Sequence, residues 1–376
     1  MSDIHGTVEK GLHIPVTDRT LAGVAEKVLA GSRIDDRDAH RILESGNIHL
    51  IGALAEHRKQ RSSGRLVYFT VNKQINYTNV CSVRCKVCAY AKGRRAKGAY
   101  TMSVDEIIGE LSQYREGLDE VHIVGGLHPD LRFDYYTSML RGIRTRFPGV
   151  TIKAFTATEI GYFAGLYKMS VDRVLKELVD AGLDTMPGGG AEVLSDGIRG
   201  ELFSGKESKD RWLETHRTAH VLGIKTNATM LYGHIETDDD IIGHLRQLRS
   251  LQDETAGFLT FVPLIFHPEN TPLRGRVGTP TGIRKLKVVA LSRLYLDNFP
   301  HIKAYWVMMS EAVTQIALHF GADDIDGTIG SEKVTHAAGA RTPAGLTKEH
   351  MVAMIKETGY VPVRRDGRYK VIEVYE

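Results

Sequence analysis

Cysteine is scarce in this sequence, and the features of secreted and membrane proteins are missing. The 376 residues contain three cysteines, so a disulfide between any two of them would leave one thiol over. No apolar run reaches the roughly 20 residues that a membrane-spanning helix needs. The first residues, Met1 to Gly6, lack the basic and then apolar order of a signal peptide. We therefore expect a cytoplasmic protein in a reducing compartment.

A strong excess of charge is also absent. The chain has 49 basic and 46 acidic residues and a net charge of +3, which is too small to favour nucleic acid or a membrane as a partner. Its 42% hydrophobic and 25% charged residues are ordinary for a globular protein. A chain of this length can bury one large core, enough for an α/β barrel with additional elements.

All three cysteines lie in one short segment, Cys81-Ser-Val-Arg-Cys85-Lys-Val-Cys88. Three thiolates can hold three irons of a [4Fe–4S] cluster and leave the fourth iron open for a small molecule. A zinc site on three cysteines would need a nearby histidine, and the next one along the chain is His122. The C-x3-C-x2-C spacing is similar to that of the radical S-adenosylmethionine superfamily. Members of that superfamily often have an aromatic residue where this chain has Val87.

The remainder of the chain reads as alternating strands and helices. Segments rich in β-branched and aromatic residues predict strands, and the stretches between them have helical periodicity. Such alternation implies a parallel sheet, and about seven strands in one series favour a closed (β/α) barrel of the TIM type over an open sheet. The predicted strands are 65–77, 120–124, 151–155, 183–186, 225–231, 258–263 and 303–307.

Four regions follow from this pattern. We expect an N-terminal arm over residues 1–17, a helical layer over 18–64, the barrel over 65–340, and a C-terminal helix with a β-hairpin over 341–376. Helix starts are marked by Ser103 with Glu106, by Ser170 and by Thr237.

Several polar or glycine-rich motifs follow the predicted strands, where parallel strands of a barrel gather their active-site residues. Gly125-Gly126 gives a ligand access to the backbone or makes a simple turn. Pro187-Gly-Gly-Gly-Ala-Glu192 has the same two interpretations. His128 and His267 could orient a substrate or move a proton, or they could be hydrogen-bonded loop residues. Arg217, between His216 and His220, could bind a carboxylate.

Several motifs together resemble the aminofutalosine synthase family of the futalosine route to menaquinone. The resemblance covers residues 66–340. A dehypoxanthine futalosine cyclase of the same pathway is the alternative, and deazaflavin-precursor synthases and tyrosine lyase are further alternatives. Ala154-Phe-Thr-Ala-Thr-Glu159 favours the synthase, because the cyclase has Ser-Pro-Pro-Glu there; Thr158 departs from the synthase's usual Val. The motifs are Val121–Asp130, Lys153–Glu159, Pro187–Glu192, His216–His220, Asn227–Glu236, Gln252–Thr255 and Phe266–Thr271.

This resemblance implies a reaction and a set of site residues. S-adenosylmethionine would be cleaved at a [4Fe–4S] cluster, and the 5′-deoxyadenosyl radical would add to 3-[(1-carboxyvinyl)oxy]benzoate. Aryl migration and loss of bicarbonate would then give aminofutalosine. The implied residues are Cys81, Cys85 and Cys88 for the cluster, Tyr90, Gly125, Gly126, Glu192, Asn227 and Ile235 for S-adenosylmethionine, and Arg217, His128, Glu159 and His267 for the reaction.

Partners and alternatives complete the expectations. The cluster would take its electron from a flavodoxin- or ferredoxin-like protein, and the enzyme would be a monomer or a homodimer. A non-enzymatic alternative is an iron–sulfur electron carrier. A carrier, however, is better served by four ligands than by three.

Overall fold

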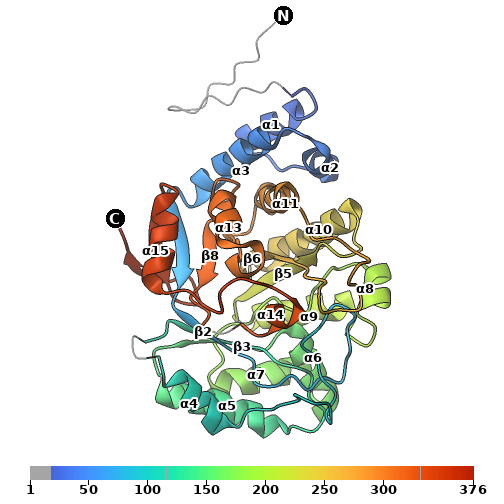
Figure 1. Cartoon of the computed structure of the whole chain (residues 1–376), viewed down its shortest axis with the longest axis vertical. Coiled ribbons are helices and arrows are strands. Elements are labelled where there is room, and N and C mark those ends of the chain that lie inside the picture. Colours follow the sequence, from blue (N-terminus) through green and yellow to red (C-terminus); the bar gives the residue numbers. More distant parts are fainter. Residues whose placement is uncertain (1–17, 115–116, 331) are drawn as a thin grey trace, which may run out of the picture.

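The computed structural model describes residues 18–114, 117–330 and 332–376, so the predicted arm over residues 1–17 lies outside the described residues. The protein is an α/β protein in which helices surround short parallel strands (Figure 1). No helix in these three ranges is both long enough and apolar enough to cross a membrane.

The first half of the chain contains the helical layer and the first strands. The elements are α1 (Ala22–Leu29), α2 (Asp36–Glu44), α3 (Ile48–Ser62), β1 (Leu66–Thr70), β2 (Asn72–Ile75), α4 (Val104–Leu111), β3 (Glu120–Ile123), α5 (Phe133–Arg146), β4 (Thr151–Ala154), α6 (Ala157–Tyr167), α7 (Val171–Ala181) and α8 (Asp196–Leu202).

The second half continues the alternation and ends in a hairpin. Its elements are α9 (Lys209–Val221), β5 (Thr226–Tyr232), α10 (Asp238–Thr255), β6 (Phe258–Ile265), α11 (Gly282–Tyr295), β7 (His301–Ile302), α12 (Trp306–Met309), α13 (Glu311–Leu318), β8 (Asp324–Gly327), α14 (Val334–Ala338), α15 (Lys348–Glu357), β9 (Val361–Arg365) and β10 (Val371–Val374).

Local sequence signals fix many of these boundaries. Ser103 and Glu106 form a capping box at the start of α4, and Thr237 and Asp240 form another at α10. Ser170 caps α7, which ends at Gly182 in the left-handed conformation. The predicted terminal hairpin is present, because β9 and β10 pair antiparallel.

The strands form three sheets. Two are parallel throughout, in the orders β2-β3-β4 and β5-β6-β7, and the third has the order β10-β9-β1-β8. Isolated parallel bridges connect these sheets at Lys153–Thr185, Met186–Thr226 and Lys303–Asp324. The predicted strand over 65–77 is divided at Val71, because its first part pairs with β8 and its second part with β3.

Two predicted strands need correction. Residues 183–186 contribute only isolated bridges through Thr185 and Met186. The strand predicted over 303–307 is not formed: β7 covers His301–Ile302, and Lys303 adds an isolated bridge to Asp324. Trp306 begins α12, and its indole N–H bonds to the carbonyl of Gly327 at 3.0 Å. The sequence analysis also missed strand β8.

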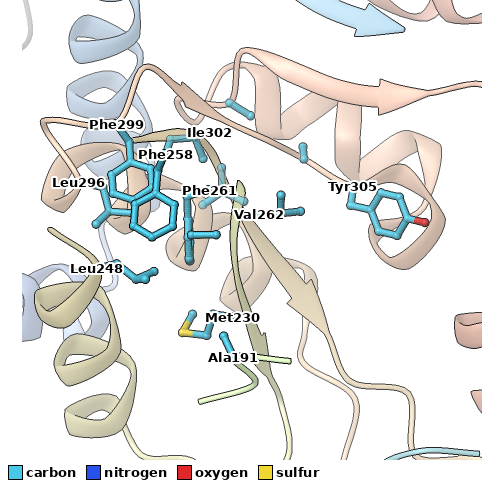
Figure 2. Close-up of a cluster of buried hydrophobic side chains, with 14 of the residues drawn as sticks. Ala191, Met230, Leu248, Phe258, Phe261, Val262, Leu296, Phe299, Ile302 and Tyr305 are labelled. Atoms are coloured by element: carbon cyan, nitrogen blue, oxygen red, sulfur yellow. The ribbon is translucent and has the colours of Figure 1, made fainter. Parts of the chain in front are cut away.

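The core between the strands and the outer helices is aromatic and aliphatic. Figure 2 shows Leu248 of α10 beside Phe258 and Phe261 of β6, with Phe299 above them. The rings of Phe258 and Phe299 stack with their centroids 5.3 Å apart. Their burial fixes the position of β6 against α10, and β6 is one of the strands that carry the site described next.

Candidate active site

The carboxyl ends of the strands enclose one cavity of about 360 Å³. This volume lies in the range of small-molecule sites, which run from about 300 to 1,000 Å³. The cavity is lined by the cysteine loop and by charged side chains of β4, of β8 and of the segment just after β7. The described residues therefore bring the predicted cluster ligands and a set of strand residues to one space.

The cysteine loop is held by backbone contacts to both its neighbours and the distant α8. Cys81 N–H bonds to the carbonyl of Lys92 at 3.0 Å, and Lys86 N–H bonds to the carbonyl of Leu202 at 2.9 Å. The N–H of Leu127 points at the sulfur of Cys81, 3.4 Å away. Such a donor stabilises a thiolate and tunes any metal that the thiolate holds.

All three thiols are reduced and half-buried, and all three line the cavity. Burial raises the pKa of the Cys85 thiol to about 11 and also raises the pKa of Cys88, so metal binding has to displace their protons. Among the described residues, no three His, Cys, Asp or Glu side chains surround one point as a single ion requires. A four-iron cluster suits this arrangement better than zinc, because each thiolate binds a different iron.

Gly126 is required by the close approach of the cysteine loop. A Cβ at this position would lie 2.3 Å from the carbonyl oxygen of Val80 and 3.1 Å from Cβ of Cys81. The predicted Gly-Gly pair therefore has a steric role in seating the loop, in addition to any contact with a ligand.

Glu159 supports the same region from the start of α6. Its carboxylate accepts hydrogen bonds from the Tyr77 hydroxyl at 2.8 Å and from the Gly125 N–H at 3.1 Å, and it completes a capping box with Thr156. Burial raises the pKa of Glu159 to about 7, although the hydrogen bonds from Thr156 and Tyr77 oppose this. Glu159 thus lines the cavity and holds Gly125 in place.

Glu192 and Lys206 form an ion pair on the cavity wall beside the cysteines. Burial alone would raise the pKa of Glu192, but the Lys206 ammonium outweighs it and leaves the pKa lowered. The pKa of Lys206 is raised, because Glu192 and Cys85 outweigh its burial. Glu192 has φ = 49°, and Asp326 and Ile329, also at the cavity, have φ of 72° and 64°. Strained backbone of this kind gathers at functional sites.

Asn227 and His267 line the cavity, and each carries a buried polar atom that makes no hydrogen bond to the described residues. The side-chain oxygen of Asn227 and Nε2 of His267 have no hydrogen-bond partner among the described residues. A buried polar atom without a partner is costly, so a polar ligand in the cavity suits both. With the three thiols and the Lys206 cation, these atoms form a donor set that fits a cluster and a zwitterionic ligand.

Most of the predicted site residues meet at this cavity. Tyr90 is 9% exposed and bonds to the Tyr100 hydroxyl at 2.5 Å. The predicted residues that line the cavity are Cys81, Cys85, Cys88, Tyr90, Gly125, Gly126, Glu159, Glu192, Asn227 and His267.

Three predicted residues lie elsewhere, and their contacts explain why. Arg217 lies on the outer face of α9, where its guanidinium pairs with Glu254 at 2.7 Å and with Glu214 at 2.6 Å. Nδ1 of His128 accepts hydrogen bonds from the backbone N–H groups of Asp130 and Leu131, so the side chain stabilises its own loop. Ile235 packs on the core beyond the end of β5.

The neighbouring His216 and His220 also have structural roles. Each donates to or accepts from the Thr226 hydroxyl, at 2.9 Å from Nδ1 of His216 and 2.8 Å from Nε2 of His220. They connect α9 to β5 and do not form a metal pair.

Several charged or polar cavity residues were not predicted from the sequence. The missed residues are Asn72, His122, Lys153, Lys206, Lys303, Asp326 and Glu332. One signal was present for Lys153 and Lys303: a lysine inside a predicted buried strand needs a partner or a ligand. No short motif joins them, because they come from strands about 150 residues apart in the chain.

Comparison with known proteins identifies the family. Residues 75–248 match the model of the radical SAM superfamily, and residues 255–376 match that of the CofH/MqnC C-terminal region. The chain is 41% identical over 365 residues to the aminodeoxyfutalosine synthase of Thermus thermophilus, with 96% of this chain and 98% of the relative covered. This chain belongs to the radical SAM superfamily. The predicted family membership is confirmed.

Two further comparisons agree. The aminodeoxyfutalosine synthase of Streptomyces coelicolor is 40% identical over 363 residues, covering 93% of this chain and 94% of the relative. Among solved structures, methylornithine synthase superposes with a TM-score of 0.73 at 19% identity, covering 91% of this chain and 97% of that one. The second similarity concerns the fold alone.

Proposed function

We propose that this protein is an aminodeoxyfutalosine synthase. The observation that carries the proposal is that one cavity joins the three cysteines to an interior lined by buried lysines, their carboxylate partners and apolar side chains. This cavity lies in a chain that aligns with such synthases over nearly its full length. The enzyme would act on 3-[(1-carboxyvinyl)oxy]benzoate and S-adenosylmethionine, and S-adenosylmethionine would be consumed.

The residues of the cavity mouth would hold the reacting groups. Cys81, Cys85 and Cys88 would bind a [4Fe–4S] cluster, which supplies the electron that cleaves S-adenosylmethionine. The backbone at Gly125-Gly126 would face the amino group of the methionine part. Lys206 would supply a cation close to the cysteines, and Asn227 would offer its unpartnered oxygen to a donor.

The reaction needs shielding from water as well as binding groups. The adenosyl radical would add to the enol-ether double bond, and the aryl group would migrate from oxygen to carbon. The carboxyl group would then leave by C–C cleavage, its unpaired electron would return to the oxidised cluster, and hydration of the CO2 would give bicarbonate. Apolar side chains of β5 and β6, including Leu231, Val262 and Leu264, line one wall of the cavity. This wall would keep water and other hydrogen donors away from the radical.

We further propose that the three sheets are parts of one (β/α) barrel. The isolated bridges between β4 and β5 and between β7 and β8 support this, as does the continuous run from β1 to β2. The C-terminal ends of the strands would then form one mouth, at which barrel enzymes place their active sites.

The electron donor would be a flavodoxin- or ferredoxin-like protein in a reducing cytosol. Lys92, Arg95 and Lys97 are exposed immediately after the cysteine loop. Such a basic surface suits an acidic donor, whose approach to the cluster it would accelerate at low salt.

Product analysis tests the proposed function. The protein is reconstituted anaerobically with iron and sulfide, then given S-adenosylmethionine, dithionite and the enol-ether benzoate. We expect the mass of aminodeoxyfutalosine, with one methionine released for each adduct. 5′-Deoxyadenosine without an adduct would contradict the synthase assignment and direct attention to dehypoxanthine futalosine as the substrate of a cyclase. No cleavage by a protein with a verified cluster would favour an electron carrier.

A further inference from the structure

The end of the cavity opposite the cysteines carries two buried lysines. Lys153 of β4 has a side chain that is 2% exposed, and the side chain of Lys303, just after β7, is 3% exposed. Both line the cavity. The interiors of such barrels are usually filled by Val, Ile and Leu, and burying an ammonium group costs free energy, so a pair of them needs a reason.

Each ammonium group has one carboxylate partner and capacity for more. Lys153 pairs with Glu120, and Nζ of Lys303 bonds to Asp326 at 3.1 Å, with Asp324 further away at 3.7 Å. A lysine ammonium has three donors. Among the described residues each of these groups donates one hydrogen bond to a side chain, which leaves two donors for a ligand.

Asp324 is shared, because its second carboxylate oxygen belongs to another ion pair. Nε of Arg365, at the end of β9, bonds to Asp324 at 2.7 Å, and both side chains are fully buried. The terminal hairpin thus places the Arg365 guanidinium beside β8, where it forms an ion pair with the Asp324 carboxylate. Lys153 and Lys303 remain the lysines that line this part of the cavity, together with the Asp326 carboxylate.

A third donor accompanies the lysines. His122 of β3 lines the cavity in register with Lys153, its partner on β4. Burial and the nearby Lys153 lower the pKa of His122 to about 4, although Glu120 opposes them, so the ring is neutral at pH 7 and keeps one N–H. The charged and titratable groups facing it are Glu120, Lys153, Lys303 and Asp326.

The wall next to these donors is apolar. Leu231, Val262 and Leu264 come from β5 and β6, and Met308 and Ile329 come from the segments after β7 and β8. Figure 2 shows Val262 on β6 and Tyr305 set apart from the packed aromatic cluster. An apolar wall that ends in two ammonium groups is complementary to a flat ring carrying one carboxylate.

We propose that Lys153 and Lys303 bind the ring carboxylate of the benzoate substrate at the inner end of the cavity. This rests on the proposed function. This binding mode directs the enol ether toward the cysteine loop, where the adenosyl radical would form. The ring carboxylate is unchanged by the reaction, so one anchor serves the substrate throughout the aryl migration. His122 adds a neutral donor to the same carboxylate.

The test compares two substrates in the reconstituted holoenzyme. One is the enol-ether benzoate, and the other is 2-phenoxyacrylate, which lacks the ring carboxylate. The variants are Lys153→Met and Lys303→Met, which keep the length of the side chain and remove the charge. Lys287→Met is the matched control, because Lys287 is half-buried and bonds to the carbonyl of Leu43, away from the cavity.

We expect the wild-type enzyme to prefer the benzoate by about 100-fold or more in kcat/KM, because the analogue leaves two buried ammonium groups without a ligand. Each cavity variant should lower kcat/KM for the benzoate by about 10- to 100-fold, chiefly through KM, and the analogue should fall far less. The preference for the benzoate over the analogue is therefore lost in Lys153→Met and Lys303→Met, whereas Lys287→Met keeps the wild-type preference.

Three results would overturn the assignment. A wild-type enzyme that does not discriminate between the two compounds has no site for the ring carboxylate. Variants that slow both compounds equally would show that the lysines only support the fold. If the wild type converts neither compound, the proposed function fails. The binding affinities of 3-hydroxybenzoate and phenol then test the lysine assignment separately. Equal affinities for the two compounds, or affinities that stay unchanged in both lysine variants, would refute the assignment.

Discussion

The two ends of the cavity are built in different ways. At the mouth, the three cysteines lie within residues 81–88, on a loop held by backbone hydrogen bonds to Lys92, Leu127 and Leu202. At the inner end, the polar groups are His122 of β3, Lys153 of β4, Lys303 just after β7 and Asp326 of β8, which are spread from residue 122 to 326. The cysteines are therefore brought together by their spacing in the chain, whereas the lysines proposed to bind the substrate are brought together by the strands.

The first prediction concerns removal of one of the three cysteines at the cavity mouth. Cys85→Ala leaves two thiolates for a cluster that needs three, so we expect iron content to fall and adduct formation to drop by more than about 1,000-fold. Iron analysis and mass spectrometry of the product measure this. Unfolding temperature should change little. Full turnover by Cys85→Ala would exclude the loop as the cluster site.

The second prediction separates the mouth from the inner end. Lys206→Gln leaves the carboxylate of Glu192 buried without its cation, and we expect KM for S-adenosylmethionine to rise by about 10- to 100-fold. KM for the benzoate should change by less than about threefold. Initial rates at varied concentrations of each substrate measure both constants.

Lys209→Gln is the matched control, because Lys209 pairs at 2.6 Å with Asp196, which is 71% exposed. An exposed pair of this kind contributes about 1 kcal/mol or less. Equal effects of the two substitutions would mean that the Lys206 pair is not part of the site.

The third prediction concerns Glu159 on the wall between the two ends. Its pKa is about 7 in the folded protein and near 4.5 in the unfolded chain, so between these values the folded state keeps a proton that the unfolded state loses. The stability of the wild type relative to Glu159→Gln should therefore fall by about 3 kcal/mol as pH rises from 4.5 to 7. Urea unfolding of both proteins across this range measures the difference.

Glu106→Gln provides the opposite sign. The hydrogen bonds from Ser103 lower the pKa of Glu106, so its contribution to stability is present above the ordinary pKa of Glu and is lost as pH falls. A pH-independent difference between wild type and Glu159→Gln would show that Glu159 titrates normally.

The smallest expected effect is outside the cavity. Arg217→Gln removes exposed ion pairs with Glu214 and Glu254, so stability should fall by about 1 kcal/mol or less and both KM values should stay constant. A rise in KM for the benzoate would contradict the position of Arg217 on the outer face and return it to the site.

Short-range signals account for the successful parts of the sequence analysis. The capping boxes at Ser103 and Thr237 involve residues three apart, and their helices begin where predicted. The failures occur where pairing between distant segments decides the structure. Residues 303–307 resemble a strand, but the indole of Trp306 reaches Gly327 and the chain turns into α12.

The candidate site divides in the same way. Cysteine spacing, strand-end position and the family resemblance together predicted thirteen site residues, and ten of them line the cavity. They failed for Arg217 and His128, because a side chain that could bind a ligand can as readily satisfy a neighbouring carboxylate or backbone N–H. Nothing in the local sequence distinguishes these outcomes.

By itself, the sequence determined the cysteine loop, the strand–helix alternation and the family, since each depends on residues close together or on motifs of fixed spacing. Only the tertiary structure decided which charges face the cavity. Lys153 and Lys303 lie 150 positions apart, and their proximity to one ligand depends on the register of several strands. Burial then removes the solvent that would screen their charges, which supports the proposal that these two lysines bind a carboxylate.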